Sequence, residues 1–272
     1  NHRIRRMEYI NMKETQDINI IRVKGNEVKR EEDRVIIEHP FTLFIEEEEI
    51  ITLLCSPSSL EYLALGFLYS EGFIDSLEDI KSIRIEEDKG ICYMKLYNVN
   101  KLRENLRGKR TITSGCGKGT LFYNVLDSFK SQKVENILPI EIEKIKLLVR
   151  EFNRKSELFK DTGGVHSCAL CNYDEILIFE EDIGRHNALD KVFGRALAEN
   201  INTLDKIIFT SGRISSEILI KAAKRQVPII VSRSAPTSLS IELGEELGIS
   251  LIGFARGEKM NIYTNKKGGG FL

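Results

Sequence analysis

The sequence has 272 residues, with 40 lysines and arginines against 41 aspartates and glutamates, so the formal net charge at pH 7 is −1. This length suffices for two modest domains, and the even charge balance excludes a general electrostatic attraction to nucleic acid. No apolar run approaches the roughly 20 residues that span a bilayer, and the first residues lack a hydrophobic signal core. We therefore expect a cytoplasmic protein that binds neither nucleic acid nor membrane.

The first half of the chain is expected to form a small α+β domain over residues 18–135 that includes the loop around Cys116. Apolar residues at helical spacing between Leu60 and Leu68 predict a helix that ends at Gly72. Asp88-Lys89-Gly90 suits a hairpin turn. Short apolar runs around these features predict strands over Ile18–Val23, Val35–Ile37, Phe41–Ile45, Ile50–Leu54, Ile80–Ile85 and Ile91–Leu96.

Cys116 lies in a glycine-rich loop that follows the basic stretch Lys101–Arg110. Free cysteine side chains are most often inert and buried. The glycines of Gly115–Gly119, however, cannot pack a core and leave backbone N–H groups exposed. Arg110 and Lys118 are close enough in sequence to favour the thiolate. This combination indicates a reactive thiol at position 116.

Cys168 and Cys171 form a Cys-x-x-Cys pair that follows His166, a spacing that admits zinc or a redox pair. A structural zinc site normally needs four ligands, and the apolar Ala169-Leu170 between the cysteines fits a buried strand. We therefore expect no metal site. The two remaining cysteines lie in apolar strand settings and are expected to be structural, namely Cys55 and Cys92.

The second half of the chain, residues 139–265, alternates strands and helices, which predicts an α/β layer fold with a largely parallel sheet. A preceding helix over Glu141–Leu158 is expected to bridge the two halves, and the boundary falls near Gln132–Pro139. The alternating elements are expected at Glu175–Phe179, Arg185–Glu199, Lys206–Phe209, Ser215–Arg225, Ile229–Ser232, Ser238–Leu247 and Ser250–Phe254.

Three of the predicted strands end in turns that carry an arginine, over Thr210–Arg213, Ser232–Thr237 and Phe254–Gly257. One such turn is more often a helix N-cap with a solvated arginine. Because the carboxyl ends of parallel strands meet at one sheet edge, three of them favour a site for phosphate or another anion. Gly163-Gly164 before His166 would let the backbone approach such a ligand closely.

A fourth turn, Glu181–Asn187, opens the helix that contains Asp190 and Lys191. Two interpretations stay open here. Asp182 could be a helix N-cap, with His186 and Asp190 a surface pair one helical turn apart; alternatively, the turn could contact a nucleotide. Neither GxxxxGK[ST] nor GxGxxG occurs in the sequence, so a nucleotide would need a different cradle.

Several segments together resemble the formate dehydrogenase accessory sulfurtransferase family (FdhD). Their order and spacing make the resemblance more specific than any single motif. The matching segments are Glu38–Phe41, Leu63–Leu68 with Glu71-Gly72, Thr162–His166, Glu181–Ala188 with Asp190-Lys191, Gly212-Arg213 with Ser215 and Glu217, Ser234–Thr237, and Gly253–Gly257 with Asn261 and Tyr263.

The resemblance implies a sulfurtransferase that carries persulfide sulfur from a cysteine desulfurase to the molybdenum bis-guanine-dinucleotide cofactor, which then activates formate dehydrogenase. Cys116 matches the family's persulfide cysteine. The resemblance also implies a homodimer and a cytidine-deaminase-like, three-layer α/β domain in the second half. The cofactor would be a bound substrate that GDP mimics, and the residues expected to bind it are Phe254, Ala255, Arg256, Gly257, Glu258, Lys259, Arg185, His186, Asn187 and Arg213.

Many family members carry a second cysteine in the loop, where this sequence has Gly119, so an internal disulfide relay is excluded there. A single thiolate suffices for sulfur transfer, because it attacks the donor persulfide and keeps the outer sulfur. Two other functions stay open. One is a chaperone that delivers the molybdenum cofactor without moving sulfur. The other is a zinc-dependent deaminase, although the His-x-Glu and Pro-Cys-x-x-Cys pair of such enzymes is absent.

Overall fold

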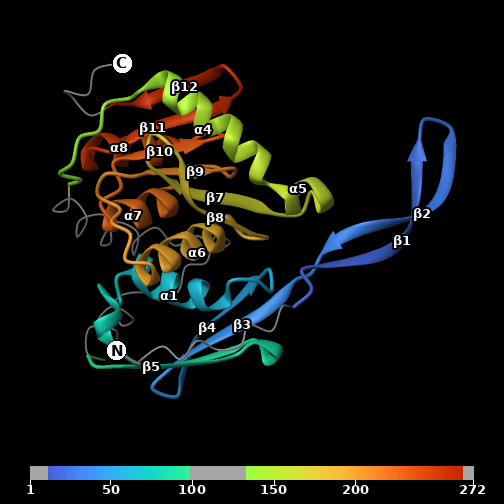
Figure 1. Ribbon diagram of the computed structural model, residues 1–272, viewed down its shortest axis with the longest axis horizontal. Coiled ribbons are helices and arrows are strands. Elements are labelled where there is room, and N and C mark those ends of the chain that lie inside the picture. Colours follow the sequence, from blue (N-terminus) through green and yellow to red (C-terminus); the bar gives the residue numbers. More distant parts are fainter. Residues whose placement is uncertain (1–11, 99–132, 266–272) are drawn as a thin grey trace.

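The computed structural model describes residues 12–98 and 133–265, so Cys116 and its loop lie outside the described residues. In the first half, an N-terminal hairpin arm extends away from the rest of the protein, and the strands that follow form a separate sheet beside helix α1 (Figure 1). The elements of this half are β1 (Thr15–Lys24), β2 (Glu27–Ile36), β3 (His39–Ile45), β4 (Glu48–Cys55), α1 (Leu60–Glu71), β5 (Ile80–Glu86) and β6 (Ile91–Leu96), with short 3₁₀ turns η1 (Leu77–Asp79) and η2 (Glu87–Lys89).

The arm is longer than the sequence predicts. Its strands pair antiparallel from Thr15 opposite Ile36 to Lys24 opposite Glu27. Most of β2 consists of charged residues, so it lacks the apolar alternation that identifies a half-buried strand. The hydrophobic pattern therefore could not predict the full length of this strand pair.

The sheet beside α1 has the order β4-β3-β6-β5, with β3 parallel to β6 and the neighbouring pairs antiparallel. Alternate residues of β3 point to one face, and Phe41, Leu43 and Ile45 are buried against α1 in one hydrophobic cluster. Helix α1 ends at Gly72 in the left-handed conformation, with φ of 79°, which confirms the predicted stop. The predicted hairpin between β5 and β6 is also confirmed.

The second half forms one sheet in the described part of the chain, with the order β12-β11-β10-β9-β7-β8. Two predicted elements of this half have the predicted bounds, β10 and α8, as does β6 in the first half. The elements of this half are α4 (Ile142–Lys155), α5 (Glu157–Thr162), β7 (His166–Cys171), β8 (Ile176–Asp182), α6 (Arg185–Ala198), β9 (Ile207–Thr210), α7 (Ser216–Lys224), β10 (Ile229–Ser232), α8 (Ser238–Leu247), β11 (Ser250–Arg256) and β12 (Lys259–Thr264).

The expectation of a largely parallel sheet is wrong. Strands β9, β10 and β11 are parallel to one another, whereas β7 is antiparallel to both β8 and β9, and β12 is antiparallel to β11. The reason is the length of the connections. Short turns lead from β7 to β8 and from β11 to β12 without a crossover helix, and such turns can join only antiparallel neighbours.

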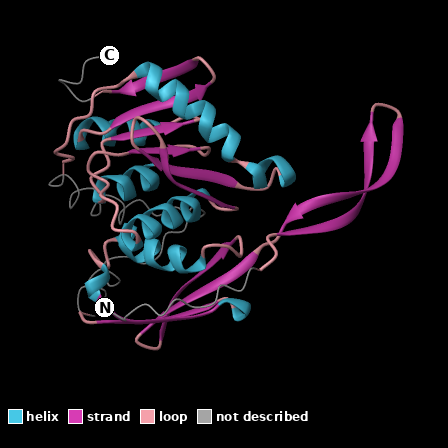
Figure 2. Ribbon diagram, viewed as in Figure 1, coloured by secondary structure: helices cyan, strands magenta, loops and turns pink. Residues whose placement is uncertain are grey.

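Helices cover both faces of this sheet, which gives three layers (Figure 2). Helix α4 buries Ile145, Leu148 and Phe152 against one face, and α6, α7 and α8 pack on the other. The expectation that the helix after residue 141 bridges the two halves is therefore wrong: its apolar stripe packs on the C-terminal sheet. Within the described ranges, no helix is both long and apolar enough to cross a membrane.

The two halves meet where α1 crosses α6, through a glycine on each helix. A Cβ atom added at Gly66 would lie 1.7 Å from the Asp190 carbonyl oxygen, and one at Gly194 would lie 1.9 Å from the Tyr62 carbonyl oxygen. No other residue type fits at either position without moving a backbone. The absence of side chains thus allows direct backbone contact between the helices.

Candidate functional site

The candidate site lies at the edge of the C-terminal sheet where the parallel strands β9, β10 and β11 end. Because β7 runs antiparallel to β9, its first residues reach the same edge, and the Ser211 N–H donates to the Ser167 carbonyl oxygen at 2.9 Å. Strand β8 returns along β7 and ends there as well, with Asp182 opposite His166. The fold therefore gathers the predicted arginine-bearing turns and the turn at 181–187 at one edge.

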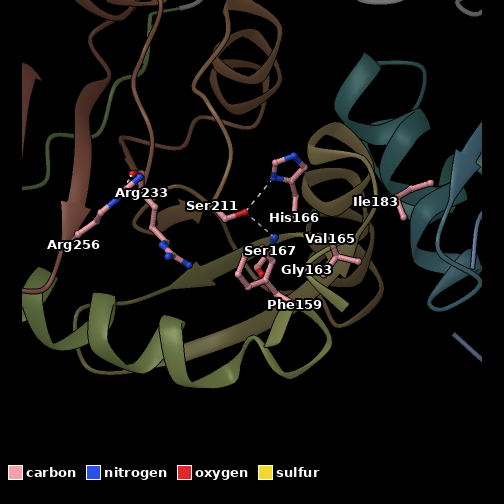
Figure 3. Close-up of a pocket in the computed structure, with 10 residues that line it drawn as sticks. Phe159, Gly163, Val165, His166, Ser167, Ile183, Ser211, Arg233 and Arg256 are labelled. Carbon is pink, nitrogen blue, oxygen red and sulfur yellow. Dashed lines mark hydrogen bonds between the residues drawn. The ribbon is translucent and has the colours of Figure 1, made fainter. Parts of the chain in front are cut away.

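A cavity of about 290 Å³ opens at this edge (Figure 3). The charged side chains in its lining are the arginines at 233 and 256, and no aspartate or glutamate of the described residues lines it. Arg256 and Ile183 lie on opposite sides of the cavity in the view of Figure 3. The lining residues are Phe159, Gly163, Gly164, Val165, His166, Ser167, Ile183, Ser211, Arg233 and Arg256.

The Ser211 hydroxyl connects two neighbouring strands of the cavity wall. Its Oγ accepts the Ser167 backbone N–H at 2.9 Å and lies 3.3 Å from Nδ1 of His166 (Figure 3). The pKa of His166 is lowered, first by burial and then by the positive charges of Arg185 and His186. The free protein therefore favours the neutral imidazole, whereas an anion bound in the cavity would favour the protonated ring.

Arginine side chains give the cavity a positive charge that the described residues do not neutralise. Arg256 donates from Nε to the Arg233 carbonyl oxygen at 3.0 Å, and among the described residues neither arginine has an ion-pair partner. The pKa of Arg233 is lowered by burial and by the charge of Arg256. Nearby, the Arg185 side chain packs against Gly212, and its buried Nε finds no hydrogen-bond acceptor in the described chain. Such a cluster is suited to a phosphate-bearing ligand.

The expected cofactor segment at the end of β11 is split between surface and core. Phe254 is 43% exposed and has a φ of 51°, an uncommon conformation for a residue other than glycine. Ala255 is buried in the cluster under α4, and Gly257 makes the turn into β12 with a φ of 57°. Of this predicted segment, Arg256 is the residue that lines the cavity.

The last two residues of the segment, Glu258 and Lys259, do not line the cavity. The Glu258 carboxylate forms an ion pair with Arg150 of α4 and lies 3.4 Å from the Lys146 ammonium. Its pKa is lowered by these two cations, Arg150 first. Lys259 begins β12 on the surface, opposite Arg256. Among the described contacts, Glu258 thus binds helix α4, and a ligand would have to compete with these ion pairs.

The residues near the start of α6 that were expected to bind the cofactor also make contacts with other parts of the protein. His186 places Nε2 at 2.9 Å from Oε2 of Glu217, and this contact is the main cause of the lowered pKa of Glu217. Arg213 is exposed in the turn before α7. The alternative of a surface pair between His186 and Asp190 is wrong, because Asp190 is buried and binds the Lys221 ammonium at 2.6 and 2.7 Å.

Asn187 belongs to a buried network that joins the two halves. Its amide donates to Asp182 Oδ1 at 2.9 Å and to the Leu54 carbonyl oxygen at 2.8 Å. Asp182 forms an ion pair with Lys191 at 2.7 Å, with both side chains fully buried, and Lys191 also donates to the Ser56 hydroxyl at 2.8 Å. The alternative of Asp182 as a helix N-cap is wrong, since the cap position falls two residues later. Asp182, Asn187 and Lys191 therefore stabilise the fold beside the cavity.

The four cysteines in the described part of the chain are buried and unpaired by disulfides. Burial raises the pKa of the Cys55 thiol to about 12 and also raises the pKa values of the Cys92, Cys168 and Cys171 thiols. Cys168 packs on one face of the sheet and Cys171 on the other, so the pair cannot share a zinc ion or form a disulfide. Among the described residues no group of histidine, cysteine, aspartate or glutamate side chains is placed to hold a metal ion.

Of the ten residues that line the cavity, Arg256 alone belongs to the expected binding set; the lining residues with polar side chains that the set lacks are His166, Ser167, Ser211 and Arg233. Ser211 and Arg233 lie in the arginine-bearing turns that the sequence predicts at the ends of β9 and β10. A rule that includes every polar residue of these turns would have found both. His166 could not be found this way, because its place at the edge depends on the antiparallel direction of β7.

Comparisons with known proteins agree on one family. The family model described as FdhD/NarQ matches residues 36–268. The chain is 44% identical over 246 residues to the Bacillus licheniformis "Sulfur carrier protein FdhD", covering 90% of this chain and 94% of the relative. A protein of the same description from Listeria monocytogenes serotype 4b is 45% identical over 235 residues, covering 86% and 90% of the two chains.

A solved structure has a similar fold. It is described as the crystal structure of a putative formate dehydrogenase accessory protein from Desulfotalea psychrophila, and it matches with a TM-score of 0.73 and 25% sequence identity. The match covers 92% of this chain and 96% of that chain. The order of the motifs, the fold and these relatives lead to one conclusion: the chain belongs to the FdhD/NarQ family.

Proposed function

We propose that this protein is a sulfur carrier, which takes persulfide sulfur from a cysteine desulfurase and passes it to the molybdenum bis-guanine-dinucleotide cofactor used by formate dehydrogenase. The observation that carries the proposal is the cavity whose charged lining consists of arginines. The names of the relatives, sulfur carrier and formate dehydrogenase accessory protein, support the same function.

The cavity is suited to the nucleotide part of this substrate. Arginine binds phosphate through paired N–H donors, and Arg233 and Arg256 lie side by side without a carboxylate partner among the described residues. The partly exposed ring of Phe159 lines the same cavity and offers an apolar face to a guanine or pterin ring. These groups would bind and orient the substrate without taking part in bond changes.

Sulfur transfer would start at Cys116. Its thiolate attacks the outer sulfur of the desulfurase persulfide, the S–S bond of the donor breaks, and the desulfurase thiolate leaves. Cys116 then holds the sulfur as a persulfide until the molybdenum centre accepts it. The buried, high-pKa thiols of the other cysteines support the assignment to Cys116, because the thiolate is the reactive species.

Intact-mass analysis after incubation with a cysteine desulfurase and cysteine tests this assignment. We expect one added sulfur atom, removed by thiol reductants, in the wild-type protein and in Cys168→Ala, and none in Cys116→Ala. An equal adduct on Cys116→Ala would refute the role of Cys116.

A cofactor-delivering chaperone is the second candidate function, and the lone cysteine of the loop, with Gly119 in place of a second one, favours it. The chaperone would bind the same substrate in the same cavity but would not need a thiol. Complementation separates the two functions: in cells without the native accessory protein, Cys116→Ala should fail to yield active formate dehydrogenase if sulfur is carried. Full activity with this variant would identify the chaperone.

A further inference from the structure

The segment that leads from α5 into β7 forms one wall of the cavity. Six of the ten lining residues lie between positions 159 and 167, and the phenyl ring among them belongs to Phe159 of α5 (Figure 3). Helix α5 has only six residues, and a helix of this length is not stable without contacts to its surroundings. The position of the Phe159 ring therefore depends on what holds α5 in place.

Helix α5 begins without a hydrogen bond to its own cap residue. Ser156 is at the N-cap position, where a serine hydroxyl usually accepts a backbone N–H of the first turn, but its side chain makes no such bond. Its Oγ lies 2.6 Å from Oγ of Ser167 instead. Because the Ser167 hydroxyl donates to Oε1 of Glu181 at 3.0 Å, Ser156 is the donor in the contact between the two serines. The first N–H groups of α5 therefore need another acceptor.

The Glu181 carboxylate is that acceptor, and it binds both ends of the wall. Its Oε1 accepts the Ser167 hydroxyl, and its Oε2 accepts the Leu158 backbone N–H at 3.3 Å. Burial raises the pKa of Glu181, while hydrogen bonds from Ser167 and from the backbone of Leu158 and Phe159 oppose this rise. No lysine or arginine in the described part of the chain pairs with this carboxylate, so the polar contacts of its side chain are all with the wall.

Glu181 is itself held by the buried part of the protein. It lies directly opposite Ser167 in the antiparallel pair of β7 and β8, and its backbone carbonyl oxygen accepts from the Lys191 ammonium at 3.2 Å. Lys191 is the fully buried cation of the network that joins the two halves. Glu181 therefore connects a short helix at the cavity to the rigid interior.

The other contacts of the wall lie elsewhere or are weaker. Arg34 of β2 lies 3.5 Å from Asp161, but both side chains are at least half exposed, and exposed ion pairs contribute little. Ile36 packs against Gly164, where an added Cβ would lie 2.7 Å from Cγ2 of Ile36, and this contact supports the turn after α5. Among the described residues, the start of the helix is thus held by Glu181.

We propose that Glu181 is a positioning residue of the nucleotide site. By holding α5, it keeps the Phe159 ring where the ring packs on the base of the bound nucleotide. Glu181 does not line the cavity, so it acts through Phe159 rather than on the ligand. The phosphates are bound separately by Arg233 and Arg256, which lie at the ends of β10 and β11. The inference rests on the proposed function, in which the cavity binds the nucleotide part of the cofactor.

Two ligands measured by calorimetry separate the base contact from the phosphate contacts. GDP carries a base, and inorganic pyrophosphate does not. Glu181→Ala should weaken GDP binding about tenfold, the size of one lost base-stacking contact. The same variant should leave pyrophosphate binding within about twofold of the wild type, because the arginines stay in place. A general loss of the cavity would instead weaken the binding of both ligands equally.

Three further variants control for charge and folding. Glu181→Gln should restore most of the GDP affinity, because its amide oxygen accepts the Leu158 N–H and its NH₂ group donates to Ser167 Oγ. Glu175→Ala removes the same charge at an exposed position before β8 and should change neither affinity. Where Glu181→Ala folds poorly, Glu181→Met makes the same test, since methionine fills a similar volume without offering an oxygen acceptor.

A double-mutant cycle tests whether Glu181 acts through Phe159. Phe159→Ala should weaken GDP binding about tenfold and spare pyrophosphate binding, as Glu181→Ala does. Because both changes remove the same base contact, Glu181→Ala in the Phe159→Ala background should cause less than about twofold further loss.

The outcomes separate this inference from the proposed function. Wild-type binding of GDP with unchanged affinity in Glu181→Ala, equal weakening of GDP and pyrophosphate, or losses that multiply in the double variant would each overturn the role of Glu181 alone. A wild type that binds neither ligand would refute the nucleotide site, and the inference with it.

Discussion

Replacing Lys191 with methionine should destabilise the protein strongly. The Lys191 ammonium and the Asp182 carboxylate lie 2.7 Å apart with both side chains fully buried. Methionine has a similar length but no charge, so the Asp182 carboxylate would lose its counter-ion without regaining water. Removing one partner of a buried ion pair typically costs about 3–5 kcal/mol. At about 2–4 °C per kcal/mol for chains of this size, the melting temperature should fall by roughly 6–20 °C.

Thermal unfolding followed by circular dichroism measures this effect, and the chain offers a matched control. Lys144 forms an ion pair with Asp174 in which the two side chains are 42% and 77% exposed. Exposed pairs contribute about 0–1 kcal/mol, so Lys144→Met should change the melting temperature by less than about 4 °C. Equal shifts for Lys191→Met and Lys144→Met would refute the view that the buried network holds the two halves together.

Three other substitutions or titrations address the cavity and the helix crossing. Arg233→Gln should weaken GDP binding about tenfold by calorimetry, the loss of one charge-assisted contact; unchanged affinity would remove Arg233 from the site. The pKa of His166, lowered in the free protein, should rise when GDP binds, since an anion favours the imidazolium; GDP should therefore bind more tightly as the pH falls from about 7.5 to 6. In an NMR titration, an unmoved His166 signal would place the ligand elsewhere. Gly66→Ala should cost about 3 kcal/mol in urea unfolding, because the new methyl group meets the Asp190 carbonyl; a loss below about 1 kcal/mol would mean that the helices separate easily.

The local sequence pattern was sufficient to predict an element where that element has a clear apolar pattern and ends at a recognisable residue. The stripe from Leu60 to Leu68 and the stop at Gly72 predicted α1, and the bounds of β10 and α8 were predicted to the residue. Pattern failed for β2, whose charged residues form a strand because β1 lies beside them. It also failed for β12, which is half-exposed and pairs with β11 through a tight turn.

The site was predicted in part, for a physical reason. Arginines after parallel strands can be located from sequence, because all such ends point the same way. Whether a given side chain faces a ligand or the core depends on packing that no local pattern records. Asn187 and Arg185 are two residues apart on α6, yet one closes a buried network and the other contributes its charge to the cavity side. His166 reaches the same edge only because β7 reverses direction.

The contact between Gly66 and Gly194 has a mechanical consequence. Helices whose backbones touch cannot slide or rock without breaking van der Waals contact along the crossing. This contact therefore opposes relative motion of α1 and α6. Domain closure of the kind that encloses a ligand between two lobes is therefore not available to this crossing. Among the described residues, the side chains and turns at the sheet edge are therefore the parts that would adjust to a ligand entering the cavity.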